Sequence, residues 1–135
     1  MDNHTPLDKA KEFETMLNLL ENNQAPILKS TCLFYVAVHY LHALALQQNK
    51  VIGNSHGERK IAINPYRDNP KRVFIFKKHI YDAYMSLKEF SEYERYHIDS
   101  SLIVYQKQIK DNYEKSKLHF ANFVNYLVNN HNFQK

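Results

Sequence analysis

The longest apolar run in the chain is residues 32–46, CLFYVAVHYLHALAL, in which only His39 and His42 interrupt the apolar and aromatic positions. The run is shorter than the roughly 20 residues that a membrane span needs, and it carries two imidazoles. A helix that is apolar on all sides has to be covered on all sides. We therefore predict a buried central helix, from about Ile27 to Gln48, around which the other segments pack.

Three other long stretches have apolar residues three and four positions apart, which is typical of amphipathic helices. The first opens at Thr5-Pro6 with a hydroxyl N-cap and a proline, and ends near Asn22. The second is expected to open at Asn69-Pro70 and to reach about Glu92. The third should follow a cap at residue 99, 100 or 101 and continue for about 28 residues. The expected core positions of the three helices are Leu7, Ala10, Phe13, Leu17 and Leu20; Val73, Phe76, Ile80, Ala83, Leu87 and Phe90; and Leu102, Tyr105, Ile109, Tyr113, Phe120, Phe123 and Leu127.

A short helix from His56 to about Ile63 is also predicted, because Ser55-x-x-Glu58 has the form of a capping box and Pro65 stops a helix. The sequence has no alternating Val- and Thr-rich runs joined by tight turns, the pattern that indicates β-hairpins. The chain is therefore expected to be all-α. We predict an antiparallel bundle of four long helices plus one short helix, in a single domain of residues 1–135.

The net charge of +4 is concentrated in one part of the sequence. Residues 51–79 carry seven Lys or Arg and two Asp or Glu, whereas residues 1–50 sum to −1 and residues 80–135 to zero. Such a segment attracts phosphates or acidic partners, although a solvated lysine-rich surface is an equally good interpretation. The irregular stretch 49–69 overlaps it and holds both glycines of the chain, and loops of that length are usually functional or mobile.

Cys32 is the only cysteine, which excludes an intramolecular disulfide and a thiolate metal cluster. A free thiol in the central apolar run fits a reducing cytoplasm, and the N-terminal sequence lacks the pattern of a secretion signal. We therefore expect a soluble cytoplasmic protein with no membrane partner.

The sequence contains few motifs of metal or cofactor sites. His39 and His42 are three residues apart with no carboxylate nearby on the same helix, so packed or surface histidines are favoured over a metal site. No Gly-rich phosphate loop, His-Glu-x-x-His helix, calcium loop or nucleophile elbow occurs, and we expect no metal and no cofactor. Arg72 and His79 satisfy the loose Arg-x4–6-His pattern of a class of helical ribonucleases, a match that chance gives about half the time in a chain of this composition.

Three segments read together form a more specific pattern. The central run carries Phe34, Tyr35, Ala37 and His39; the loop carries Ser55, His56 and Arg59; and the following helix ends in Ser91, Arg95 and Tyr96. In this order and spacing, over about residues 28–97, they resemble a branch of the HEPN superfamily. Its members are small helical bundles common in prokaryotic toxin and defence systems.

The resemblance implies an RNA- or nucleotide-binding protein, a ribonuclease or a component of a toxin–antitoxin or defence system. HEPN ribonucleases carry an Arg and a His near the end of the helix that here closes with SEYERYH. In this chain those positions fall near Ser91 and Arg95, so the nuclease pattern is not kept there.

Metal-independent RNA cleavage needs a group that transfers protons and a cation that stabilises charge on the phosphate. If the protein is an enzyme, we expect a metal-independent endoribonuclease in which Arg59 and Arg95 supply the cation and His56 or His97 transfers the proton. The loop would then have to fold back onto the helix end. The expected RNA contacts are Arg59, Arg72, Lys77 and Tyr96, with the tyrosine ring offering a surface for a base.

Two alternatives stay open. The first is that Arg59 and Arg95 form ordinary ion pairs with Glu92, Glu94 or Asp99, and that Tyr96 packs at the rim of the bundle. The second is a non-catalytic module that binds a protein partner or forms a homodimer. Its basis is the presence of ten tyrosines and eight phenylalanines, since tyrosine is enriched at interfaces.

Overall fold

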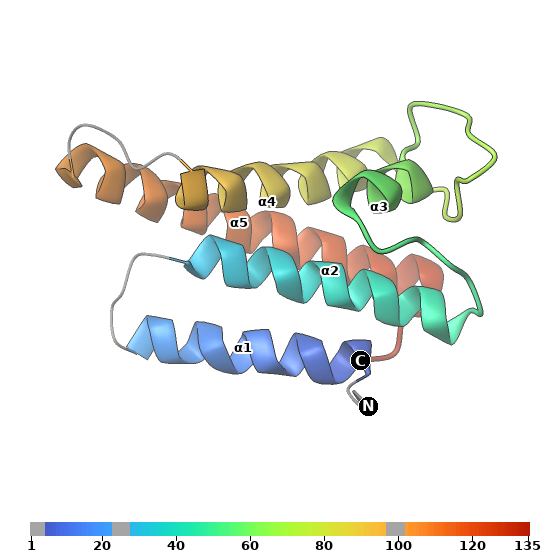
Figure 1. Cartoon of the computed structure of the whole chain (residues 1–135), viewed down its shortest axis with the longest axis horizontal. Coiled ribbons are helices and arrows are strands. Elements are labelled where there is room, and N and C mark those ends of the chain that lie inside the picture. Colours follow the sequence, from blue (N-terminus) through green and yellow to red (C-terminus); the bar gives the residue numbers. More distant parts are fainter. Residues whose placement is uncertain (1–4, 23–27, 97–101) are drawn as a thin grey trace.

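The computed structural model describes residues 5–22, 28–96 and 102–135, which form a bundle of five helices (Figure 1). Their bounds are α1 Pro6–Asn22, α2 Lys29–Gln47, α3 His56–Ile63, α4 Lys78–Tyr96 and α5 Leu102–His131. No residue in the described ranges is in a strand. The predicted all-α bundle of four long helices and one short helix is therefore confirmed. Successive long helices run in opposite directions (Figure 1).

The central position of α2 follows from its sequence, as predicted. Helices α1, α4 and α5 all contact it, and its apolar side chains from Cys32 to Ala45 are buried, apart from the half-buried Tyr35. Leu46, near the end of the helix, is 61% exposed. Phe34, Leu41 and Leu44 are inaccessible to solvent. None of the described helices combines the length and the hydrophobicity that crossing a membrane would require.

The first turn of α2 is capped by a side chain from another helix. Leu28, at the N-cap position, has a left-handed φ of 73° and offers no side-chain cap. Instead, the buried Glu94 of α4 accepts hydrogen bonds from the backbone N–H of Ser30 at 3.1 Å, the N–H of Thr31 at 2.7 Å and the Thr31 hydroxyl at 2.9 Å. A carboxylate at a helix N-terminus satisfies free donors and complements the helix dipole. Glu94 thus joins the end of α4 to the start of α2.

The short helix α3 begins and ends where the capping box predicts. The Ser55 hydroxyl accepts from the Glu58 backbone N–H at 3.1 Å and donates to the Glu58 carboxylate at 3.1 Å. Gly53, just before it, has a φ of +80°, and a Cβ there would collide with the Glu58 side chain. Because residue 53 is a glycine, the backbone of the loop can approach the Glu58 side chain of α3 this closely.

The predicted start of α4 at Asn69-Pro70 is wrong, because the helix begins at Lys78. The segment before it is not helical, and the backbone N–H groups of Val73 and Phe74 both donate to the Ala62 carbonyl, at 2.8 and 3.0 Å. Side chains here alternate with a period of two: Phe74 and Phe76 are buried, whereas Ile75 between them is 70% exposed.

The two later helix boundaries differ less from the prediction. Helix α4 continues to Tyr96, four residues beyond the expected end at Glu92. Helix α5 has 30 residues, close to the predicted length, and its expected cap at residues 99–101 lies outside the described residues. Ser116, which interrupts the apolar stripe of α5, is buried and donates to the Asn112 carbonyl at 2.8 Å.

Candidate anion-binding site

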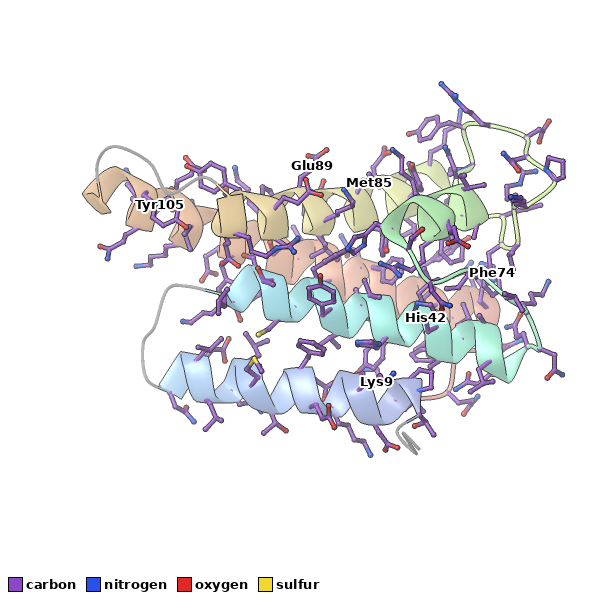
Figure 2. All side chains as sticks on the ribbon, in the orientation of Figure 1. Lys9, His42, Phe74, Met85, Glu89 and Tyr105 are labelled. Atoms are coloured by element: carbon purple, nitrogen blue, oxygen red, sulfur yellow. The ribbon has the colours of Figure 1, made fainter. Side chains whose placement is uncertain are left out.

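A cavity of about 700 Å³ lies between α1, α2 and α3. Its volume is in the range of small-molecule sites. Figure 2 shows two of its side chains, Lys9 on α1 and His42 on α2. No Asp or Glu is among the described residues that line it. The lining residues are Pro6, Lys9 and Phe13 from α1; Tyr35, Val38, His39 and His42 from α2; and Asn54, Ser55, His56 and Arg59 from the loop and α3.

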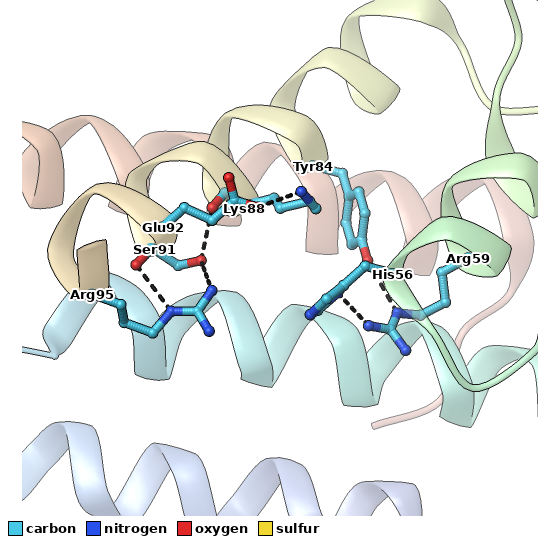
Figure 3. A network of polar contacts seen from close by, with 7 residues as sticks. All are labelled: His56, Arg59, Tyr84, Lys88, Ser91, Glu92 and Arg95. Atoms are coloured by element: carbon cyan, nitrogen blue, oxygen red, sulfur yellow. Dashed lines mark hydrogen bonds and ion pairs between the residues drawn. The ribbon is translucent and has the colours of Figure 1, made fainter. Parts of the chain in front are cut away.

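Arg59 is the most deeply placed cation of this cavity, with 5% of its surface exposed. Its Nε donates to the Tyr84 hydroxyl at 3.4 Å and its Nη2 donates to Nδ1 of His56 at 2.5 Å (Figure 3). A guanidinium is always a donor, so Nδ1 of His56 accepts and the imidazole proton is on Nε2. His56 therefore presents an N–H donor, while its other nitrogen holds Arg59 in place.

The three imidazoles of the cavity are neutral at pH 7. Burial lowers the pKa of His39 to about 4, and the neighbouring His42, Lys9 and Arg59 act in the same direction, because each disfavours a second positive charge beside it. Burial and the charges of Arg59 and Lys9 also lower the pKa of His42. Burial is the main cause of the lowered pKa of His56, and the charge of Arg59 is the second. The cavity thus combines the fixed positive charges of Lys9 and Arg59 with three neutral rings, each having one donor and one acceptor nitrogen.

Arg95 lies beside this cavity without lining it. Its Nε donates to the Ser91 carbonyl at 3.2 Å, and its Nη2 to the Ser91 hydroxyl at 3.3 Å (Figure 3). The guanidinium carbon is 5.9 Å from the centroid of the Tyr35 ring, which in turn is 6.2 Å from the His56 ring. The charge of Arg95 also lowers the pKa of His56. The structure therefore brings His56 and Arg59 of α3 to the same stretch of α2 as Arg95, with Tyr35 between them.

Two of the three carboxylates considered as ion-pair partners of these arginines, Glu92 and Glu94, have other contacts, and Asp99 lies outside the described residues. Glu94 caps α2, and Glu92 accepts a hydrogen bond from Lys88. Arg95 is close enough to Glu92 to lower the pKa of its carboxyl. Within the described residues, the partners of Arg59 are His56 and Tyr84.

The other residues proposed from the sequence lie elsewhere. Arg72 forms an ion pair with Asp68 at 3.0 Å and lines a second hollow, of about 410 Å³. Lys77 is exposed and lines a third, of about 380 Å³, together with His79. The basic segment 51–79 is thus divided among three places on the molecule. Tyr96 ends α4 but its side chain lies outside the described residues, as does the whole of His97.

Sequence reasoning missed three of the cavity residues. From the sequence, His39 and His42 are candidate metal ligands and His39 is also part of the HEPN-like pattern, but neither is predicted as a site residue, and Lys9 is not singled out. The signal for the two histidines was their spacing from Tyr35: positions i, i+4 and i+7 lie on one face of a helix, and that face lines the cavity. Lys9 belongs to a different helix, and no pattern in the sequence connects it with this face.

The arrangement of these groups can bind an anion by direct hydrogen bonds. In the described part of the chain, no group of three or more His, Cys, Asp or Glu side chains is placed to hold a metal ion. A comparison of the chain with protein-family models found no match, and comparisons with curated proteins and with solved structures found none either. The interpretation of the site therefore depends on its own geometry.

Proposed function

We propose that the protein binds RNA or a nucleotide through the cavity between α1, α2 and α3, in a HEPN-like bundle. The observation that carries the proposal is the cavity lining: two cationic side chains and three imidazoles, with no carboxylate among its described residues. A guanidinium provides paired N–H donors for phosphate oxygens, and a helix N-terminus adds further favourable potential. The N-terminus of α3 is at this cavity, since Ser55 and His56 line it.

The same residues could support cleavage of a bound RNA. Metal-independent cleavage needs an acceptor for the 2′-hydroxyl proton and a cation near the phosphate. Arg59 would supply the cation. Because Nδ1 of His56 already accepts from Arg59, the proton acceptor would be a ring nitrogen of His39 or His42, to which no other described residue donates a hydrogen bond. A ribonuclease of this kind, acting in a toxin–antitoxin or defence system, is the activity that the HEPN resemblance suggests.

Binding of fluorescein-labelled single-stranded RNA at increasing salt concentration tests this proposal. We expect binding that weakens with salt, because contacts to phosphates release counterions. Lys9→Gln should weaken it about tenfold, the equivalent of about 1.4 kcal/mol. Lys60→Gln removes the same charge from an exposed position of α3 that does not line the cavity, and should change the affinity less than twofold.

Two results would contradict the proposed function. One is wild-type protein that shows no salt-sensitive binding to RNA or to mononucleotides. The other is an equal loss of affinity in the Lys9→Gln and Lys60→Gln variants, which would indicate a diffuse attraction to the basic surface.

A second candidate function is a homodimeric interaction module. Val51 is 84% exposed and Ile61 39% exposed, and both line the hollow that contains Arg72. Exposed apolar side chains that cluster mark interaction surfaces. Light scattering should then show a dimer at micromolar concentration that Val51→Asp converts to a monomer. A wild-type protein that is monomeric at this concentration would contradict the dimer.

A further inference from the structure

We propose that the cavity binds a phosphate monoester, the terminal phosphate of an RNA strand or of a mononucleotide, in preference to the internal phosphodiesters of a strand. This inference rests on the proposed function and names the chemical group that the same site recognises. Three properties of the cavity support it: the depth of Arg59, the number of hydrogen-bond donors, and the packing of the aromatic rings.

The depth of Arg59 restricts what can reach its guanidinium. Only 5% of its surface is exposed, and it is held from within by Tyr84, which is 1% exposed. A ligand must therefore enter the cavity to reach this group. A phosphodiester inside a strand has a nucleoside on each side of the phosphorus, whereas a monoester has only one substituent and can enter with its free oxygens first.

The donors in the cavity match a dianion with three unsubstituted oxygens. Within the described residues, the bonds to Tyr84 and His56 use two of the five guanidinium N–H groups of Arg59, which leaves three for a ligand. Lys9, Nε2 of His56 and the rings of His39 and His42 line the same space. A monoester carries a charge of about −1.5 to −2 at pH 7, and a diester carries one charge and two free oxygens. The cavity therefore suits the monoester better.

The aromatic rings of the cavity are packed against one another. The centroid of the Tyr35 ring is 5.3 Å from that of Phe13, on which it stacks, and 5.4 Å from that of Phe34. His56 and the Arg95 guanidinium also lie beside the Tyr35 ring. Phe13 also stacks on His39 at 5.5 Å. These contacts occupy the rings of Tyr35 and Phe13, the tyrosine and phenylalanine among the described lining residues, and leave little of their surface for a base. The ligand is then recognised by its phosphate and sugar, and its affinity does not depend on the base.

One RNA strand prepared in three forms tests the inference: with hydroxyl groups at both ends, with a 5′-phosphate, and with a 3′-phosphate. Each form competes with a labelled 5′-phosphorylated strand, and AMP, UMP and adenosine are measured beside them. We expect at least one phosphorylated end to bind about tenfold or more tightly than the hydroxyl form, the equivalent of one additional charged contact. AMP and UMP should compete equally, and adenosine should not compete.

Two variants show whether this preference arises in the cavity. Arg59→Lys keeps a positive charge but loses the fork of the guanidinium, so it should reduce the preference for the phosphorylated end about tenfold. Lys60→Gln should keep the preference. Circular dichroism confirms that both variants fold, and if Arg59→Lys does not fold, Lys9→Gln takes its place with the same expected result.

The possible outcomes separate this inference from the proposed function. If phosphorylated and unphosphorylated strands bind equally well, the inference is wrong and RNA binding stands. If only internal segments of a long strand bind and mononucleotides do not compete, the inference is again wrong. If none of the probes binds, both proposals fail.

Discussion

Replacing Glu94 tests whether the bundle depends on a cap that one helix provides for another. This carboxylate is 2% exposed and accepts three hydrogen bonds from the first turn of α2, at 2.7, 2.9 and 3.1 Å. Glu94→Ala removes all three acceptor contacts and leaves two buried backbone N–H groups without their partner. Glu94→Gln keeps the size of the side chain but turns one of the two accepting oxygens into an NH2 group that faces a donor.

The expected loss follows from these contacts. Loss of a helix N-cap costs about 1 kcal/mol, and each buried donor left unsatisfied costs about 1–3 kcal/mol. The Glu94→Ala change should therefore lower the free energy of unfolding by about 3–5 kcal/mol. Burial also raises the pKa of the Glu94 carboxyl, so the ionised group itself is costly, and this offsets part of the loss. For Glu94→Gln we expect about 1–3 kcal/mol.

Urea unfolding followed by circular dichroism, with wild type and both variants at pH 7, measures these values. Glu89→Ala is the matched control, because Glu89 is an exposed residue of the same helix, and it should cost less than about 0.5 kcal/mol. A loss below about 1 kcal/mol for Glu94→Ala would refute the reasoning, because Glu94 would then not cap α2.

Three other predictions concern single positions. In an NMR titration the His39 imidazole should stay neutral down to about pH 4, and a midpoint near 6.5 would contradict its burial. Because its pKa is below the ordinary 6.5, the contribution of His39 to the stability of the fold is present above pH 6.5 and is lost toward pH 4. Phe76→Ala should cost about 3–5 kcal/mol and Ile75→Ala less than about 0.5 kcal/mol in urea unfolding, whereas similar losses would contradict the alternating burial of this segment. Gly53→Ala should cost about 1–2 kcal/mol, because φ is +80° and the Cβ meets the Glu58 side chain; unchanged stability would count against this backbone conformation.

Most of the fold could be predicted because its signals are local. The continuous apolar run identifies α2 as the central helix, and the spacing of apolar residues identifies α1 and α5. Helix α3 begins at His56 and ends at Ile63, as its capping box indicates. In each case the residues that determine the element are within a few positions of one another.

The start of α4 was predicted wrongly because two patterns overlap in one segment. Val73, Phe76 and Ile80 have helical spacing after Asn69-Pro70, whereas Val73-Phe74-Ile75-Phe76 fits the alternation of an extended segment equally well. In the structure the segment is extended, and two of its backbone N–H groups donate to the Ala62 carbonyl. That contact joins positions 11 and 12 residues apart and has no sequence signature.

The candidate site could be predicted only in part for the same reason. The capping box and the HEPN-like motifs pointed to His56 and Arg59 of α3 and to Arg95 of α4, which pack beside one stretch of α2. The hydrogen bond between Arg59 and Tyr84 and the position of Lys9 in the cavity both depend on how separate helices pack. The role of Glu94 is similar: a search for ion pairs among nearby arginines does not lead to backbone groups 63 and 64 residues away.

The histidines provide the most direct test of the central claim, that the cavity between α1, α2 and α3 binds phosphate. We suggest following the imidazole signals of all eight histidines by NMR while AMP is added to the wild-type protein. The signals of His39, His42 and His56 should shift together and saturate, because these three rings line the cavity, whereas those of His79 and His119 should not move. Saturating shifts at His79 or His119 without shifts at the three cavity rings would place the ligand elsewhere and contradict the account.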